Sequence, residues 1–404
     1  MAKNNRVALL LNANMAYDRG IITGISSFLK NGTPWNLFIG EQNLFSIDDF
    51  SKWQGDGVIA DFDHPEIRDA IKSRNIPVVG ISSSEMVANT MQDYPVVMSD
   101  NKQIINMAAR FLKMRRYTHL AFCGYPNRPF NDWSANREQL LRDWCERNQC
   151  AYSQFSAKDN IDTWDSDLQC LCDWLSRLPK PVGIIAANDV RARQLSYACQ
   201  LANISIPEDV SIMGIDDDEL NCTLSLPTLT SVRQGTRAMG YLAASLLQPL
   251  MDGKNLAKRH HYVQPERVIG RDSTDFFHFK DNLVRGALSL IRINQGNIKV
   301  KQILAELGCS RGAIDNKFHD ELGMSLHAYL LDSQLNLALE LLVDTEQTLS
   351  EIAKVVGFSS PQYLSCAIKK RWNMTPGMLR EQKGVTNREL APLIEDEGEM
   401  LKEA

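Results

Sequence analysis

Residues 349–371 read LSEIAKVVGFSSPQYLSCAIKKR, and this stretch decides the fold of the C-terminal part of the chain. Its first half carries an apolar stripe at helical spacing, formed by Ile352, Val355 and Val356. The stripe stops at Gly357. Ser360 then suits the N-cap of a second helix, and Pro361 suits the first helical position, where a missing N–H costs nothing. The stretch therefore predicts two helices joined by a tight turn, a helix-turn-helix.

The same pattern occurs earlier, over Val300 to Glu321. One apolar helix stops at Gly308, and a second is predicted over 311–321, with Ile314 and Phe318 on one face. Between the two motifs, apolar residues recur at helical spacing from Leu326 to Leu342. About twenty residues of helix span roughly 30 Å, close to the ~34 Å between successive major-groove faces of B-DNA. The spacing predicts that both second helices reach one side of a duplex.

These residues resemble the AraC/XylS-type DNA-binding domain. The resemblance rests on the elements Leu349-Ser350-Glu351-Ile352-Ala353, Val356-Gly357-Phe358-Ser359, Tyr363-Leu364, Lys369-Lys370 and Thr375-Pro376. It implies an all-α domain over 286–383 with two helix-turn-helix motifs. Four positions depart from the family pattern, namely Gln334, Leu364, Ile368 and Asn373. They leave the predicted fold unchanged, but the family's base preferences cannot be transferred to this chain.

Side chains near the start of reading helices reach base edges, and basic residues contact phosphates. On this basis the expected DNA-contacting residues are Arg311, Asp315, Asn316, Lys317, Gln362, Ser365, Lys369, Lys370 and Arg371. Asp315 is the weakest of them, because phosphates would repel it. The alternative is that each lies at a solvated position of its helix.

Charge and composition agree with a soluble regulator of two or three domains. The chain has 404 residues, 44% of them hydrophobic, and a formal net charge of −5. Residues 282–383 hold 12 Lys/Arg against 10 Asp/Glu, and 384–404 hold 2 against 6. Affinity for DNA must therefore come from where the basic residues stand rather than from net charge. We expect 384–404 to be an acidic tail without fixed structure.

No cofactor or metal is expected. The nine cysteines lack paired CxxC spacing, and the adjacent His260 and His261 would face opposite sides of a strand. The sequence has no signal-peptide pattern and no apolar run as long as a membrane span, so we expect a cytoplasmic protein.

Upstream of the motifs, short apolar runs alternate with amphipathic ones. Strands are predicted at 7–11, 35–39, 57–60, 78–81, 96–98, 120–123, 183–186, 211–215, 230–232 and 268–269. Helices are predicted at 18–30, 65–73, 101–113, 135–148, 165–177, 189–202 and 234–251. This alternation favours parallel sheets covered by helices. We expect two α/β lobes, roughly 6–125 and 126–245, facing each other over a cleft.

Polar residues gather where these strands end, which is the edge at which parallel sheets bind small ligands. They are Asn12, Asn14, Tyr17, Asp18 and Arg19; Asp61 and Asp63; Asn188, Asp189 and Arg191; and Asp216, Asp217 and Asp218. Carboxylates, amides and arginine suit a neutral sugar, whose hydroxyls both donate and accept. Trp133 or Tyr17 would supply an aromatic platform.

Several of these residues, and the further candidate Arg137, also have a purely structural interpretation. Asp18 and Asp189 could be helix N-caps, and Asp217 and Asp218 could be solvated loop charges. Trp133 could belong to the core and Arg137 to a helix surface.

This region resembles the LacI/GalR-type effector domain, which is similar to periplasmic sugar-binding proteins. The resemblance rests on Ala187-Asn188-Asp189, Met213-Gly214-Ile215-Asp216-Asp217, Leu229-Thr230-Ser231-Val232 with Gln234, Met239-Gly240, Ala243-Ala244 and Arg137. It implies sugar contacts by Arg137, Asn188 and Asp216, and an effector domain over 1–275 followed by a linker over 276–285. Gln234 is a further candidate ligand residue. We expect DNA binding to come from the C-terminal motifs rather than from the N-terminal helix-turn-helix of that family.

An effector domain ahead of an AraC-type domain resembles a group of bacterial sugar-operon activators. Asn12-Ala13-Asn14, Ala16-Tyr17-Asp18-Arg19 and Arg191-Ala192-Arg193 carry this resemblance. It implies D-xylose or a similar pentose as the ligand, whereas the residues alone indicate only a small sugar. We therefore expect a homodimeric transcription activator that binds promoter DNA and RNA polymerase.

An enzyme is disfavoured because no phosphate-binding loop, metal-ligand spacing or nucleophile elbow is present. A transport protein is disfavoured by the missing signal peptide.

Overall fold

The computed structural model divides the chain into two compact units, Met1–Phe276 and Phe277–Ala404. It describes residues 4–30, 35–39, 50, 52–125, 131–155, 164–254, 256, 259–275, 279, 281–294, 296–345 and 347–381. The predicted acidic tail, 384–404, lies outside the described residues. So do 276–278 and 280 of the predicted linker, whose last residues form the first turn of helix α11, Asn282–Ile293.

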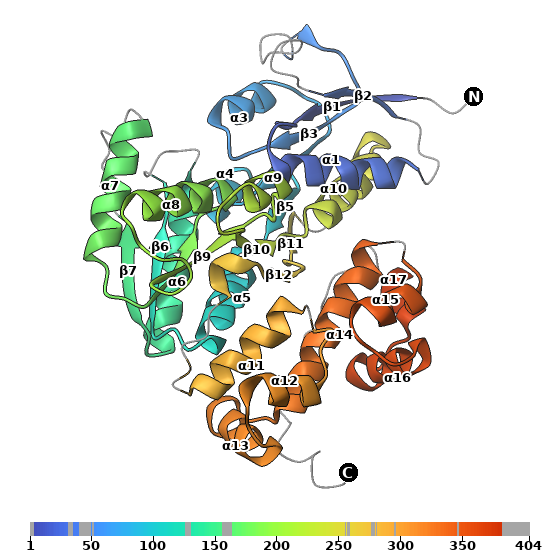
Figure 1. The fold of residues 1–404 in the computed structure, drawn as a ribbon. Helices are drawn as coiled ribbons and strands as arrows, with labels where there is room; N and C mark the ends of the chain where they lie inside the picture. The colour runs from blue at the N-terminus through green and yellow to red at the C-terminus, as the bar shows by residue number, and fades with distance from the viewer. Residues whose placement is uncertain are drawn as a thin grey trace. The chain divides into compact units, whose positions relative to one another are not determined.

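The first unit contains two six-stranded sheets (Figure 1). The sheet of the N-terminal lobe has the order β11-β5-β4-β3-β1-β2 and is parallel throughout. Its strands are β1 Asn5–Leu10, β2 Trp35–Ile39, β3 Gly57–Asp61, β4 Val78–Ser82, β5 Val96–Ser99 and β11 His260–Val263. The sheet of the C-terminal lobe has the order β12-β10-β9-β8-β6-β7, with β12 antiparallel to β10. Its strands are β6 His119–Cys123, β7 Ala151–Phe155, β8 Val182–Ala186, β9 Val210–Ile215, β10 Thr230–Arg233 and β12 Arg267–Ile269.

Helices cover both faces of each sheet, because these strands are apolar on both sides. The helices are α1 Ala16–Leu29, α3 Pro65–Lys72, α4 Glu85–Thr90, α5 Asn101–Met114, α6 Asp132–Arg147, α7 Trp164–Arg177, α8 Asp189–Leu201, α9 Glu219–Thr223 and α10 Thr236–Met251. In the N-terminal lobe, α1 and α10 pack on one face and α3 and α4 on the other. Two glycines let α1 and α10 touch, since a Cβ on Gly24 would lie 2.0 Å from the Arg237 carbonyl oxygen, and one on Gly240 would lie 1.9 Å from that of Ile21.

The chain crosses between the lobes three times, after β5, after β10 and after β11. The crossings are hydrogen-bonded to one another. The Asp100 N–H donates to the Val263 carbonyl at 2.9 Å, and the Glu266 N–H donates to the Arg233 carbonyl at 2.9 Å. Three short, adjacent connections form the kind of hinge at which two lobes can close on a ligand.

The two-lobed α/β fold predicted from the sequence is confirmed, together with ten of its strands. The predicted lobe bounds, roughly 6–125 and 126–245, are wrong, because β6 lies in the sheet of the C-terminal lobe and α10 packs on the sheet of the N-terminal lobe. Strands β7 (AYSQF) and β11 (HHYV) were missed because polar residues leave each without an apolar run, and both lie at sheet edges. An edge strand lacks the continuous apolar run by which a central parallel strand is recognised. The His260–His261 pair lies on edge strand β11, as expected.

The second unit is all-helical, as predicted. Its helices are α11 Asn282–Ile293, α12 Val300–Leu307, α13 Arg311–Leu322, α14 Leu326–Asp344, α15 Leu349–Val355, α16 Pro361–Trp372 and α17 Pro376–Glu381. Pairs α12–α13 and α15–α16 form the two helix-turn-helix motifs, and the long helix α14 joins them (Figure 1). One apolar core lies around Ile303, Ile314 and Phe318, and a second lies around Ile352, Leu364 and Ile368.

The local signals read from the sequence act as predicted in this unit. Ser360 Oγ accepts the Tyr363 N–H at 3.1 Å, and Pro361 starts α16. Gly308 and Gly357, at the ends of the first helices of the two motifs, have φ of +61° and +81°. Among the described residues, no helix has the length and apolarity needed to span a membrane.

Candidate sugar site and candidate DNA-binding surface

The N-terminal lobe presents three carboxyl groups at the ends of β1 and β3. Asp18, in the first turn of α1, accepts the Asn12 N–H at 2.6 Å, just beyond β1. Asp61 is the last residue of β3, and Asp63 follows it. Asp63 accepts the hydroxyl of Ser82 at 2.6 Å and the N–H of Ser83 at 2.9 Å, both at the end of β4. Neighbouring parallel strands thus bring these acids together, as the sequence predicted.

Burial shifts the ionisation of these acids. Burial raises the pKa of Asp18 to about 7, and the negative charges of Asp63 and Asp216 raise it further. The hydrogen bond from the Asn12 N–H acts in the opposite direction and lowers this pKa. Burial likewise raises the pKa of Asp61 well above its usual range, with Asp63 and Asp18 adding to the effect. The pKa of Asp63 is also raised by burial. Desolvation outweighs the hydrogen bonds and positive groups near these carboxyl groups, and perturbed groups of this kind gather at functional sites.

Arg137 is linked to the N-terminal lobe through Asn101. Its Nε donates to Asn101 Oδ1 at 2.8 Å and its Nη1 to the Ala187 carbonyl at 2.7 Å. The Asn101 amide in turn donates to the Ser83 carbonyl of the N-terminal lobe at 2.6 Å. Arg137 is 2% exposed, so its interpretation as a surface helix residue is wrong. Burial lowers the pKa of Arg137, while the carboxylates of Asp216 on the C-terminal lobe and Asp63 on the N-terminal lobe oppose the shift.

Asn188 is held in one orientation. Its Oδ1 caps α8 by accepting the Arg191 N–H at 3.0 Å and also accepts the Tyr125 hydroxyl at 2.9 Å. Because both lone pairs of Oδ1 are used, the amide nitrogen is the group left for a ligand, and it can only donate. Arg191 stacks over Tyr125 and forms an ion pair with Asp167, which fixes this arrangement from behind.

Asp216 follows β9 and accepts the amide of Gln234 at 2.6 Å. Burial raises its pKa to about 6, although Arg137 and Gln234 oppose the shift. Gln234, in the second crossing, is 3% exposed, and its Oε1 has no hydrogen-bond partner among the described residues. A buried acceptor of this kind requires a donor from water or a ligand.

Two aromatic residues accompany these polar groups. Trp133 is half-buried and lies over the Arg137 guanidinium at 4.9 Å, so it does not belong wholly to the core. The Tyr17 hydroxyl lies 3.0 Å from Ser99 Oγ and accepts the Ser83 hydroxyl at 3.2 Å. We call the residues that Arg137 and these contacts bring together the interlobe site. It comprises Tyr17, Asp18, Asp61, Asp63, Ser83, Asn101, Trp133, Arg137, Asn188, Asp216 and Gln234.

Three predicted ligand residues take other positions. Asn14 lies in an exposed turn. Arg19 donates to the Asn14 carbonyl at 2.7 Å and lies 3.9 Å from Asp218 of the opposite lobe. Asp189 is fully engaged, because its two oxygens accept Ser231 Oγ at 2.6 Å and the Asp218 N–H at 2.7 Å.

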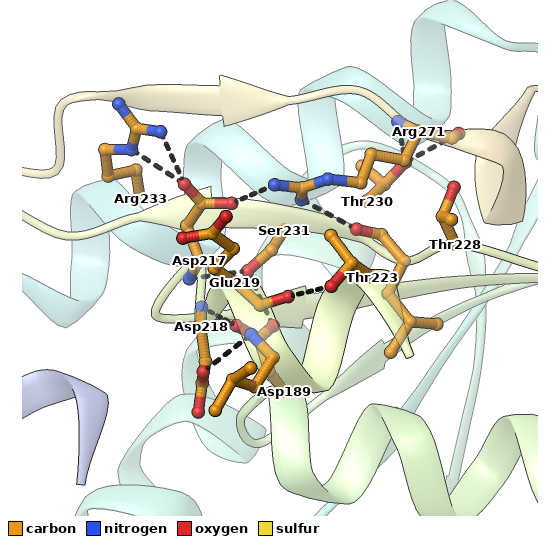
Figure 2. A network of polar contacts seen from close by, with 12 residues as sticks. Asp189, Asp217, Asp218, Glu219, Thr223, Thr228, Thr230, Ser231, Arg233 and Arg271 are labelled. Atoms are coloured by element: carbon orange, nitrogen blue, oxygen red, sulfur yellow. Dashed lines mark hydrogen bonds and ion pairs between the residues drawn. The ribbon is translucent and has the colours of Figure 1, made fainter. Parts of the chain in front are cut away.

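The alternative that Asp18 and Asp189 are helix N-caps is wrong. The N-caps are Met15 for α1 and Asn188 for α8. The alternative that Asp217 is a solvated charge is also wrong, since its carboxylate lies between Arg233 and Arg271 (Figure 2). Asp218 is the N-cap of α9.

Sequence reasoning missed Ser83, Asn101 and Tyr125. These three residues could have been predicted in the same way as the others, from their position just after a strand. Each follows the carboxyl end of a parallel strand, namely β4, β5 or β6. Within the described residues, no group of three or more His, Cys, Asp or Glu side chains is arranged to hold a metal ion.

In the second unit, helix α16 exposes one continuous face. Gln362, Cys366, Lys369 and Lys370 are exposed, while Ser365 is half-buried. Among the described residues, no hydrogen-bond or ion-pair partner is found for the side chains of Gln362, Lys369 and Lys370. Free basic and amide groups on an exposed helix face are what a DNA backbone and base edges require.

Other predicted DNA contacts have partners within the unit. Arg371 pairs with Asp332 of α14 at 2.9 Å. Lys317 pairs with Asp281 at 3.2 Å, and Arg311 pairs with Asp315 at 3.4 Å. Asp315 also accepts the Leu326 N–H at the start of α14, at 3.1 Å. Asp315 thus has a structural role that explains a carboxylate on a reading helix, while Asn316 stays exposed.

The fold and these two surfaces define the class of protein, an α/β effector domain joined to a double helix-turn-helix domain. Family models match both parts. Residues 6–102 match the XylR N-terminal domain, 109–274 the periplasmic binding protein-like domain and 303–382 a helix-turn-helix domain.

Similar proteins agree over nearly the whole chain. The xylose operon regulatory protein of Escherichia coli (strain K12) is 35% identical over 382 residues, which cover 94% of this chain and 97% of that protein. The protein of the same description from Haemophilus influenzae is 32% identical over 93% of this chain and 98% of its own length. A solved structure, described as the xylose-binding transcription activator xylR, superimposes with a TM-score of 0.63 at 34% identity, covering 94% of this chain and 99% of that chain.

The chain belongs to the family of xylose operon regulatory proteins. It is a DNA-binding transcription regulator, and the predicted combination of a periplasmic-binding-protein-like domain with an AraC-type domain is confirmed.

Proposed function

We propose that this protein activates transcription of a pentose catabolic operon when D-xylose binds at the interlobe site. The observation that carries the proposal is the meeting of buried and half-buried acids, amides and Arg137 from both lobes, beside a hinge of three crossings. The names of the relatives support xylose as the particular sugar. We further propose a cytoplasmic homodimer that recruits RNA polymerase and catalyses no reaction of its own.

A pentose matches the hydrogen-bonding groups that the site leaves open. Asp18 and Asp216 accept from sugar hydroxyls, and Gln234 Oε1 is a further acceptor. The amide nitrogen of Asn188 donates, as do the remaining guanidinium hydrogens of Arg137. Trp133 offers an apolar face for the ring carbons. A sugar that leaves any of these buried groups unpaired binds more weakly.

Sugar binding switches the protein by favouring one arrangement of the lobes. Asp18 belongs to the N-terminal lobe and Asp216 to the C-terminal lobe, so a sugar held by both stabilises the closed arrangement. Only the difference in sugar affinity between arrangements can drive the change. In a dimer, closure alters the relative placement of the two DNA-binding units.

Titration calorimetry tests the sugar assignment. We expect D-xylose to bind more tightly than L-arabinose or D-ribose. Asp216→Asn should weaken binding about tenfold or more, since a hydrogen bond to a charged group contributes about 1.5–3 kcal/mol. Asp173→Asn is the matched control, because Asp173 is exposed on α7, away from the site. Absence of heat with all three pentoses would mean that the effector is another compound.

The exposed face of α16 supports the proposed DNA contacts. We expect Lys369→Ala to weaken binding to every duplex and to reduce the dependence of affinity on salt, because it removes a phosphate contact. Gln362→Ala should instead change which bases are preferred. Binding by both variants that equals the parent across all sequences would exclude this face as the DNA-binding surface.

A further inference from the structure

Asp217 follows Asp216 of the interlobe site, and its carboxylate lies between two guanidinium groups. Its Oδ2 accepts from Arg233 at 2.8 Å (Nε) and 2.6 Å (Nη2), and its Oδ1 accepts from Arg271 Nη2 at 2.6 Å (Figure 2). The Asp217 side chain is 5% exposed. We call these three residues the Asp217 ion cluster. A carboxylate this deeply buried and doubly paired fixes the backbone that carries it.

That backbone also carries Asp216, in a conformation that side chains other than glycine rarely adopt. Asp216 has φ of +114° and Asp217 has φ of +54°. Such a turn persists only where its surroundings hold it. The N–H groups of residues 216, 217 and 218 donate to the Val232 carbonyl at 3.0 Å, to Ser231 Oγ at 3.0 Å and to Asp189 Oδ2 at 2.7 Å. The position of Asp216 therefore depends on β10, on Asp189 and on the Asp217 ion cluster.

The two arginines of the cluster lie on different segments of the chain. Arg233 ends β10, one residue before Gln234 in the second crossing. Arg271 lies in the last segment of the first unit, five residues before its end at Phe276. Arg271 Nη1 donates to the Leu229 carbonyl at 2.8 Å, and its N–H donates to Thr230 Oγ1 at 2.8 Å.

The residues after Arg271 are bonded to the same strands. Ser273 Oγ donates to the Ile212 carbonyl of β9 at 2.5 Å, and the hydroxyls of Thr274 and Thr230 lie 2.7 Å apart (Figure 2 shows Thr230 beside Arg271). The end of the effector unit is therefore built onto the strands that carry Asp216. A shift of the 216–217 turn would strain Arg271 and, through it, the segment that leads to the DNA-binding unit.

We propose that Asp217, held by Arg233 and Arg271, is the group that positions Asp216 for the sugar, and that Arg271 transmits this position to the segment leading to the DNA-binding unit. The proposal rests on the proposed function, because Asp216 is there assigned to the sugar. Both arginines contribute to sugar affinity. Only Arg271 contributes to the coupling between sugar and DNA, which is a property that a merely structural residue would not have.

Two matched variants of the full-length protein separate these roles. Arg233→Gln and Arg271→Gln each remove one partner of Asp217. D-xylose affinity is measured by calorimetry. DNA affinity is measured by fluorescence anisotropy, with and without D-xylose, on a duplex selected in vitro for binding to the parent protein. The ratio of the two DNA affinities is the coupling factor. Arg193→Gln is the control, because Arg193 pairs with Asn221 on the same lobe outside the cluster.

We expect both cluster variants to lower D-xylose affinity, by roughly 5- to 50-fold, because each leaves a buried carboxylate with one charged partner. The coupling factor should fall towards one in Arg271→Gln and stay near the parent value in Arg233→Gln and Arg193→Gln. Arg271→Lys, which keeps the charge, should recover part of both quantities. Thermal melts at saturating D-xylose confirm that each variant is folded.

The outcomes are distinct. A parent protein that does not bind D-xylose contradicts the proposed function itself. A parent that binds and responds, beside an Arg271→Gln variant with unchanged affinity and coupling, overturns the inference alone. Equal loss of coupling in Arg233→Gln would also overturn it, since transmission would not be specific to Arg271. If Arg271→Gln does not fold, Arg271→Lys and the isosteric Asp217→Asn decide the question, and unchanged sugar affinity in both would refute the positioning role.

Discussion

At the scale of single residues, Asp18 is a buried acid whose ionisation at neutral pH lowers the stability of the fold. The same ionised carboxylate is the group proposed to accept a sugar hydroxyl. The side chain is 4% exposed, and burial raises its pKa to about 7. In the unfolded chain the pKa of an aspartate is about 3.9. Between these values the folded protein holds a proton that the unfolded chain has released. The resulting stabilisation is fully present below about pH 4 and is lost as the pH rises through 7. At neutral pH the protein therefore keeps a partly ionised buried acid, which under the proposed function accepts a sugar hydroxyl.

Replacing Asp18 by asparagine should remove this pH dependence. We expect the sugar-free Asp18→Asn variant to melt a few degrees above the parent at pH 8 and close to it at pH 5, because a neutral amide has no charge to bury. Sugar binding by the variant should be weakened at both pH values. Melting curves from pH 5 to pH 8 measure the effect, with Asp173→Asn as the exposed control. A variant that melts below the parent at pH 8 would show that the ionised carboxylate stabilises the fold.

At the scale of elements, the two helix-turn-helix motifs use the same glycine turn in different surroundings. Gly308 and Gly357 both have positive φ. A Cβ added at Gly308 meets nothing within 4 Å, whereas one at Gly357 would lie 2.9 Å from Asn297 Oδ1 and 3.1 Å from Gln334 Nε2. Gln334 itself donates from α14 to the Gly296 carbonyl at 2.7 Å. The second turn therefore packs against the loop between α11 and α12 and against α14, and Gln334 ties α14 to that loop.

The two glycines make a matched pair for mutation. We expect Gly308→Ala to destabilise the DNA-binding unit by about 1 kcal/mol, the cost of a left-handed conformation in a residue with a Cβ. Gly357→Ala should cost about 1–3 kcal/mol more, because it also crowds Asn297 and Gln334. Urea unfolding of each full-length variant, compared with that of the parent, measures both losses. Equal losses would mean that the contact with Gln334 yields without strain.

Helix α16 offers a chemical test through Cys366, which is exposed on the same face as Gln362 and Lys369. We expect N-ethylmaleimide to alkylate Cys366 and abolish DNA binding, because the added group occupies the face that approaches the duplex. DNA bound beforehand should slow the reaction, and Cys366→Ser should keep DNA binding in the presence of the reagent. Mass spectrometry of the treated protein locates the modified thiol. A reaction rate that DNA does not change would place the contact surface elsewhere.

Much of the fold could be predicted from the sequence because its signals are local. The Ser360-Pro361 start of α16 and the central apolar strands are examples. Partners distant in the sequence could not be read in this way. Arg371 is basic and lies at a helix end, yet it pairs with Asp332, 39 residues earlier. Asp217 resembled a solvated loop charge until Arg271, 54 residues later, was seen beside it. A residue's partner follows from topology, and a single sequence does not specify it.

At the scale of the whole molecule, each unit has apolar cores of its own. Two such units unfold as separate cooperative transitions unless something couples them. A ligand raises the free energy of unfolding only of the state that it binds, by about 2.7 kcal/mol at one hundred times its Kd. Sugar and DNA thus provide independent means of stabilising the two units, and any additional stabilisation when both are present measures the coupling on which regulation depends.

We expect calorimetric unfolding of the full chain to show two transitions. D-xylose should raise only the transition of the first unit and a tightly bound duplex only that of the second, so the ligand that shifts a transition identifies its unit. With both ligands present, each transition should shift further than with one, because an effector that changes DNA affinity must have its own affinity changed by the same factor. Purely additive shifts would mean that the sugar acts after DNA binding, on contact with RNA polymerase, and the proposed repositioning of the DNA-binding units would then be excluded.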